Sequence, residues 1–173
     1  MKKNRSNLAK IFYILIVVAV LAIAGWFMVK PYLIRIKTPN ISSNFNGKAQ
    51  VSENVVIPIT IDTKDATINA AEVYLKFNNQ ELKVISVSKE NSFFKLWITD
   101  EPKFSNEKAE ISFAGGLPTP GFKGKGVIGS VTVTPLKKGL LYIEYDSKTR
   151  VLLNDGVGTA VSLRLEPIKI KVQ

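Results

Sequence analysis

Apolar and polar residues alternate along much of the chain from residue 48 onward. Two segments show the pattern most clearly, VVIPITID at 55–62 and AEVYLKF at 71–77. In the second segment one face carries Ala71, Val73, Leu75 and Phe77, and the other carries Glu72, Tyr74 and Lys76. A period of two residues is typical of a β-strand with one buried and one solvated face. The pattern therefore predicts strands and assigns their side chains to the core or to solvent.

The same pattern predicts further strands at 81–88, 109–114, 126–136, 139–145 and 160–172. After residue 40 no segment keeps a helical period over ten residues, apart from a turn near NSFFKLW at 91–97. Pro58 and Pro167 indicate edge strands or bulges, because proline cannot donate to a central ladder. About eight or nine short strands can cover their apolar faces by packing as two antiparallel sheets. We therefore expect an all-β sandwich.

The amino-terminal residues follow a different pattern. Residues 11–29 form an uncharged run of 19 residues, which as a helix spans a hydrocarbon core of about 30 Å. We expect a basic cytoplasmic tail at 1–10, a transmembrane signal anchor in contact with lipid at 11–29, a tether at 30–46 and an extracellular domain at 47–173. The protein would then be a single-pass cell-membrane protein. The alternative is a signal peptide cleaved after Ala24, because AIA at 22–24 is a small-x-small site.

Composition and charge narrow the possible functions. The chain has 173 residues with no cysteine and no histidine, which excludes disulfides, a thiol nucleophile, a Cys/His zinc site and a histidine-based triad. Seven of the 24 Lys and Arg lie in residues 1–37, which hold no Asp or Glu. The remainder of the chain therefore has 17 basic and 14 acidic residues. This is an ordinary mixed surface and does not indicate a nucleic-acid partner.

No stretch of the sequence carries a recognisable catalytic motif. The carboxylates are scattered, so no acid–base pair is placed by the pattern, and we expect no enzyme activity and no cofactor. GFKGKG at 121–126 lacks the P-loop pattern and indicates a hairpin. Asp155 in LNDGVGT is a weak candidate calcium ligand, but one acid in seven residues favours a turn over a metal cage.

Three segments in order carry a resemblance to a known family. TINAAEVYLKFNNQELKVISVS at 67–88, ISFAGGLPTPGFKGKGVIGSVTVTPLKKG at 111–139 and VLLNDGVGT at 151–159 resemble a cohesin domain. The resemblance implies a nine-stranded jelly-roll β-sandwich related to carbohydrate-binding modules. The best-known cohesins bind calcium-loaded dockerins and assemble enzymes that degrade polysaccharides. We therefore expect a non-catalytic, membrane-anchored binding module with a dockerin-like protein partner or a polysaccharide.

The resemblance also implies a binding face. Dockerin-binding cohesins use a flat sheet face, which the motif assigns here to Glu72, Tyr74 and Lys76. Many dockerin binders have an Asn two residues before an Asp on this strand, and the matching positions here are Ala70 and Glu72. Only the acid is approximately retained. The alternative interpretation of these residues is a solvated outer face with alternating charges.

Two other binding functions remain open at the level of the sequence. A carbohydrate platform needs exposed aromatic rings, for which Trp97 and Phe94 are candidates together with Tyr74, although FFKLWI at 93–98 also fits a core segment. The third possibility is an envelope scaffold or adhesin without dockerin binding.

The stretch FAGGLPTPGF at 113–122 is the most irregular part of the expected sandwich. We expect Gly115 and Gly116 to turn the chain out of its strand at positive φ, and Pro118 and Pro120 to stiffen the crossing that follows. Phe113 and Phe122 would anchor its two ends in the core.

Overall fold

The computed structural model describes residues 15–21, 23, 37–43, 45, 47–98 and 100–173. The chain divides into two compact units, Met1–Ile36 and Lys37–Gln173. The described part of the first unit, 15–21 and 23, is helical with exposed apolar side chains. None of the described helical residues belongs to a helix with the length and apolar character needed to cross a membrane. The predicted tail, the site after Ala24 and most of the predicted span and tether lie outside the described residues.

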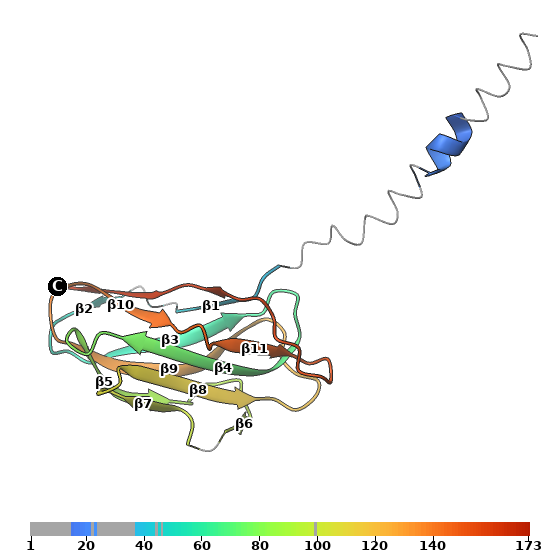
Figure 1. Ribbon diagram of the computed structural model, residues 1–173. Coiled ribbons are helices and arrows are strands. Elements are labelled where there is room, and N and C mark those ends of the chain that lie inside the picture. The colour runs from blue at the N-terminus through green and yellow to red at the C-terminus, as the bar shows by residue number, and fades with distance from the viewer. Residues whose placement is uncertain (1–14, 22, 24–36, 44, 46, 99) are drawn as a thin grey trace, which may run out of the picture. The chain divides into compact units, whose positions relative to one another are not determined.

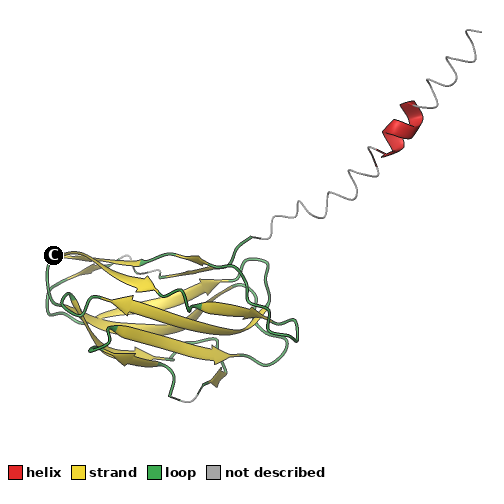
Figure 2. Cartoon of the chain, in the orientation of Figure 1, coloured by secondary structure: helices red, strands yellow, loops and turns green. Residues whose placement is uncertain are grey.

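The second unit is a β-sandwich of two sheets (Figures 1 and 2). The five-stranded sheet has the order β12-β1-β3-β9-β5. Its strands are β12 (Arg164–Leu165), β1 (Asn40–Ser42), β3 (Val55–Asp62), β9 (Lys125–Pro135) and β5 (Leu82–Ser88). All of its pairings are antiparallel except that of β1 with β12.

The eight-stranded sheet has a longer path, β2-β13-β10-β4-β8-β6, with β11 also paired to β4 and β7 also paired to β8. Its strands are β2 (Lys48–Ala49), β13 (Ile168–Val172), β10 (Gly139–Tyr145), β4 (Ile68–Phe77), β8 (Glu110–Gly116), β6 (Leu96–Trp97), β11 (Arg150–Leu153) and β7 (Lys103–Ser105). β4 therefore lies at the centre of this sheet, with β8 on one side and β10 and β11 sharing the other.

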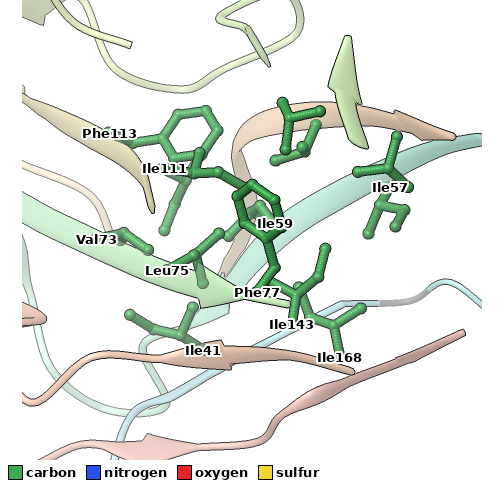
Figure 3. Close-up of a cluster of buried hydrophobic side chains, with 14 of the residues drawn as sticks. Ile41, Ile57, Ile59, Val73, Leu75, Phe77, Ile111, Phe113, Ile143 and Ile168 are labelled. Carbon is green, nitrogen blue, oxygen red and sulfur yellow. The ribbon is translucent and has the colours of Figure 1, made fainter. Parts of the chain in front are cut away.

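The core forms between the two sheets from the side chains that the alternation assigned to it. On β4 the predicted inner residues are all buried, and Val73, Leu75 and Phe77 belong to the same buried cluster as Ile59 of the facing sheet (Figure 3). Ile57, Ile59 and Ile61 of β3 are almost fully inaccessible. The predicted all-β sandwich is confirmed, and so are the core-facing and solvent-facing sides predicted for β4. Every buried apolar side chain among the described residues lies between Ile41 and Val172, so this unit supplies its own core.

Three details differ from the sequence prediction. The described residues form thirteen strands and not nine, because several strands have only two or three residues. The folded unit begins before residue 47: Asn40–Ser42, in the predicted tether, is strand β1, and Ile41 is fully buried. The predicted strand at 160–172 is divided at Pro167, where the chain passes from β12 in one sheet to β13 in the other.

Pro58 lies in an interior strand but at a position where one neighbour is absent. β1 pairs with β3 only at residues 60–62, so on that side β1 does not extend to Pro58. The register of β3 with β9 also shifts between Ile59 and Thr60. Proline is tolerated because the ladder does not need its missing N–H here.

The stretch at 113–122 is built differently from the prediction. Gly115 and Gly116 are strand residues of β8 and are not at positive φ. Gly116 is required by close approach instead, since a Cβ there would lie 2.6 Å from the Asn69 carbonyl oxygen. The turn conformation falls on Gly121, with φ of 81°. The two phenylalanines do anchor the stretch, because Phe113 is fully buried and Phe122 packs against the core.

The side chain of Asn106 binds the open backbone groups of the edge strand β5 at Val84. The Asn106 amide accepts a hydrogen bond from Val84 N and donates one to Val84 O, both at 2.8 Å. Asn106 therefore satisfies both backbone groups of Val84 as a neighbouring strand would.

Candidate partner-binding face

The outer side of β4 carries the three residues that the sequence assigned to a binding face. Glu72, Tyr74 and Lys76 alternate with Val73 and Leu75, which are buried. Because β4 is central, these side chains face solvent in the middle of the eight-stranded sheet. The structure therefore brings the three predicted residues together on one outer face.

Both charged residues of this face are held in ion pairs. Arg150 of β11 lies opposite Glu72 in the register and donates to both carboxylate oxygens, from Nη2 at 2.8 Å and from Nε at 3.0 Å. The hydrogen bond to Glu72 raises the pKa of Arg150. Lys76 Nζ lies 2.6 Å from Asp146 Oδ2, and this hydrogen bond lowers the pKa of Asp146. The two pairs fix charges on either side of Tyr74.

The backbone of Tyr74 is clamped by the turn after β10. Thr149 is buried; its hydroxyl accepts a hydrogen bond from Tyr74 N at 3.1 Å and donates one to Tyr74 O at 3.0 Å. Asp146 N donates to the same carbonyl oxygen at 2.8 Å. The side chain of Tyr74 is partly exposed, with its hydroxyl 3.5 Å from Glu72 Oε2. These bonds fix the main chain from which the ring projects.

A groove of about 270 Å³ lies beside Tyr74. It is bounded by β4, β8, β7 and the turn at 146–148. Four lysines line it, namely Lys76, Lys103, Lys108 and Lys148, together with Ser112, Glu110 and Phe104. Within the described residues Lys108 and Lys148 make no ion pair. The groove thus combines a tyrosine ring with an excess of positive charge.

A nearly buried carboxylate, that of Glu101, contacts two residues that line this groove. The side chain of Glu101 is 5% exposed and its oxygens lie 2.8 and 3.0 Å from Ser112 Oγ, which can donate to one of them at a time. Lys103 Nζ lies 3.2 Å from the same carboxylate. A buried charge is tolerated only with such partners, so these contacts hold β7 and its lysine against β8.

Arg150, Asp146, Glu101 and Lys103 were not predicted as site residues. Arg150 and Asp146 reach β4 through a register that the sequence does not display. Lys103 lies on β7, which has three residues and therefore no period to detect. The IEYD and TRV segments at 143–146 and 149–151 do contain acid and base next to apolar positions, which is the only local signal.

Two of the three aromatic residues considered for sugar binding, Phe94 and Trp97, do not line this groove. Phe94 is 4% exposed, so it belongs to the core and the prediction of a sugar-contacting ring there is wrong. Trp97 of β6 packs edge-on against Phe94, with ring centroids 5.5 Å apart, and lies opposite Gly115 of the neighbouring strand β8 in the register. The interpretation of FFKLWI as a core segment therefore holds for Phe94, and its buried ring has no face open to a sugar.

Asp155 forms a turn. Its Oδ1 accepts hydrogen bonds from Val157 N at 3.1 Å, Gly158 N at 2.9 Å and, at a longer 3.4 Å, Thr159 N. A side-chain hydrogen bond from Thr159 has the largest effect on the pKa of Asp155. Together with the backbone hydrogen bonds it lowers this pKa to about 2. Among the residues that the structure describes, no three acids come together as metal ligands. The turn interpretation of LNDGVGT explains this carboxylate by itself.

The chain is similar in structure to several solved cohesin modules. The OlpA cohesin in a type I cohesin–dockerin complex from Clostridium thermocellum has 16% identity and a TM-score of 0.61 over 79% of this chain and 100% of that chain. The cohesin module of a family 33 glycoside hydrolase from Clostridium perfringens has 17% identity and a TM-score of 0.59 over 79% and 97%.

A third similar structure is the third ScaB cohesin of R. flavefaciens in complex with a group 1 dockerin, with 23% identity and a TM-score of 0.56 over 79% of this chain and 94% of that chain. No family profile and no curated protein sequence matches the chain. At these identities the likeness concerns the fold, and there it confirms the predicted resemblance: the sandwich of this chain is a cohesin fold.

Proposed function

We propose that the chain is a non-catalytic binding module that recognises a protein partner through the outer face of its eight-stranded sheet. The observation that carries the proposal is the groove beside Tyr74, where a partly exposed ring on a clamped backbone lies among four lysines. Tyrosine is a frequent anchor in protein interfaces, because it buries a large area and keeps a polar tip. Two of the similar cohesins are seen in complex with dockerins, and this supports a dockerin-like partner.

The charges of the groove indicate which groups the partner presents. Lys108 and Lys148 line it, whereas Lys76 and Lys103 already pair with Asp146 and Glu101. A partner with acidic side chains around an apolar contact complements this surface. Glu72 contributes less directly, because the Arg150 fork occupies both of its oxygens. We therefore assign the anchor to Tyr74 and the steering to the lysines.

The test is a titration of the chain against a panel of calcium-loaded dockerin modules. Tyr74→Ala is expected to weaken binding by about 1–3 kcal/mol, the range for truncation of an interface anchor. Its free energy of unfolding should change by less than about 1 kcal/mol, because a solvent-facing position leaves no cavity. Val56→Ala is the matched control, since Val56 is 60% exposed on the opposite sheet.

Each outcome of this titration has a defined meaning. Equal binding by Tyr74→Ala and the native chain would show that the interface lies outside the groove. Failure of every dockerin to bind, with capture of another envelope protein that depends on Tyr74, would replace the dockerin-like partner with a scaffold partner. Unfolding of Tyr74→Ala would contradict the assignment of the two faces of β4.

We also propose that residues 11–29 anchor the module in the cell membrane with the sandwich outside. The support is the uncharged run and the basic residues that precede it. Protease added to intact cells should release the sandwich and leave the amino-terminal residues with the membrane. A mature protein that begins at Gly25 would favour the cleaved signal peptide instead.

A further inference from the structure

We propose a second binding site on the eight-stranded sheet, at the end formed by β2, β13 and β10, for an acidic polysaccharide. Three exposed lysines share the outer face there, Lys48 on β2 and Lys169 and Lys171 on β13. Lys171 lies directly opposite Lys48 in the parallel register of the two strands. In the part of the chain that the structure describes, none of the three makes an ion pair.

This arrangement has a cost that the fold alone does not offset. Like charges directly opposite each other on neighbouring strands are destabilising. A lysine on an edge strand discourages pairing with other chains, which accounts for Lys48 on β2. It does not account for Lys171, which lies between β2 and β10, whereas at Lys169 β13 is itself an edge, because β2 pairs only with residues 171 and 172. An anionic ligand across the three ammonium groups would relieve the repulsion.

Exposed apolar side chains accompany the lysines on β10. Leu140 lies opposite Lys171 and is 52% exposed, and Tyr142 lies opposite Lys169 and is 39% exposed. A hollow of about 350 Å³ adjoins Tyr142 and is lined also by Lys76, Phe77, Asn78, Glu81 and Glu144. A charged strip, a partly exposed tyrosine and a hollow of mixed polarity therefore follow one another across this end of the sheet.

These features together identify the chemistry of the ligand. Lysine ammonium groups bind carboxylates, and about 5–7 Å separates neighbouring lysines across and along the strands. A sugar ring can lie on Tyr142, and its hydroxyls can donate to Glu81 and Glu144. Glu81 already pairs with Lys137 at 2.8 Å and Lys76 lines the same hollow, so the hollow carries both charges and does not exclude a carboxylate-bearing chain. A polymer of carboxylate-bearing sugars satisfies both the lysines and the hollow.

The experiment uses the full chain in detergent micelles and immobilised polygalacturonate, a polymer of carboxylate-bearing sugars. Its methyl ester is the matched neutral polymer with the same backbone. We expect binding to polygalacturonate in dilute buffer, no binding to the methyl ester, and loss of binding at 1 M salt, where the screening length falls to about 3 Å. The double variant Lys169→Gln, Lys171→Gln should lose at least about tenfold in affinity, and Tyr142→Ala a similar factor.

A matched variant and a second surface make the result decisive. Lys89→Gln, Lys123→Gln removes two exposed lysines outside this patch and should bind as the native chain does. Equal losses in the two double variants would show ordinary cation exchange and overturn the site. Unchanged binding by Tyr142→Ala would also overturn it, as would binding to phosphatidylglycerol vesicles without binding to polygalacturonate. Melting curves of each variant show that the sandwich is intact. The dockerin titration is independent, because it depends on Tyr74.

Discussion

Single side chains in this sandwich stabilise the backbone conformation around them. Thr149 clamps Tyr74 through two hydrogen bonds, and Asp155 gathers the amides of its own turn. Each of these groups is polar and lies next to irregular chain, where backbone N–H and C=O groups have no ladder partner. Asp155 differs from Thr149 because its carboxylate titrates.

Asp155 makes the free energy of unfolding of the sandwich depend on pH in the acid range. Its pKa is lowered from 3.8 to about 2 in the folded chain, so the unfolded chain takes up a proton first as the pH falls. The contribution of Asp155 is complete above about pH 4 and disappears between pH 4 and pH 2. Asp155→Asn keeps the acceptor oxygen and removes the charge. We expect it to melt at a lower temperature than the native chain at pH 6, with the difference shrinking at pH 2.

Melting temperatures of the two proteins from pH 6 to pH 2 provide the measurement. Asp62 and Asp146 also have lowered pKa values, because they accept hydrogen bonds from Lys64 and Lys76, so the variant keeps part of the pH dependence. A constant difference between the two curves would contradict the role of Asp155.

At the scale of strands, the fold depends on particular residues at two kinds of place: the edge of a sheet, and a point where two segments of chain lie very close together. β5 is an edge strand of seven residues, and Asn106 occupies the backbone groups of Val84 in its middle. β8 uses Gly116 where the chain passes within contact distance of Asn69. Both features are invisible to a pattern of apolar and polar residues, because neither residue is apolar or periodic.

Asn106→Ala tests how far a side chain can replace a strand at an edge. It leaves the buried backbone groups of Val84 without their two partners, so the free energy of unfolding should fall by about 1–3 kcal/mol. Gln80→Ala, at an exposed turn with one side-chain contact of 3.4 Å, is the control. Denaturant titration of both variants is the measurement, and equal stability of the two would show that water replaces Asn106 fully.

The long strands could be predicted from the sequence, and the short ones could not. β3 and β4 each repeat the two-residue period several times, whereas β6 and β12 have two residues each. The same limit applies to the binding face. Tyr74 was predicted because its strand is regular, but Arg150 and Asp146 reach it through a register that depends on the whole sheet.

At the scale of the whole molecule, the sandwich is a self-contained unit that begins at Lys37. Its described residues include no cluster of metal-binding acids, and the chain has no cysteine. The core between the sheets is continuous and is the main source of stabilisation that the structure displays. The start of the unit matters, because β1 inserts Ile41 into this core and pairs with both β3 and β12.

Two fragments test the boundary. Residues 37–173 should fold alone into a monomer, and chelator should leave the melting temperature unchanged. Residues 47–173 lack β1 and the burial of Ile41, which alone is worth about 1.5–3 kcal/mol, so this fragment should be clearly less stable. Circular dichroism melting curves compare them. Equal stability would place β1 outside the cooperative unit, and a lower melting temperature of the first fragment with chelator would indicate a bound ion.

The position of β1 has a consequence for mechanical load. If residues 11–29 hold the chain at a membrane, a partner that pulls on the outer face transmits tension to the first strand of the sandwich. β1 lies inside its sheet, antiparallel to β3 and parallel to β12, with further hydrogen bonds from Glu166 N to Ile41 O and from Thr60 Oγ1 to Ser42 O. A pull along the axis of β1 therefore loads the bonds on both of its sides together in shear, so they resist as a group and do not open one at a time like a zipper.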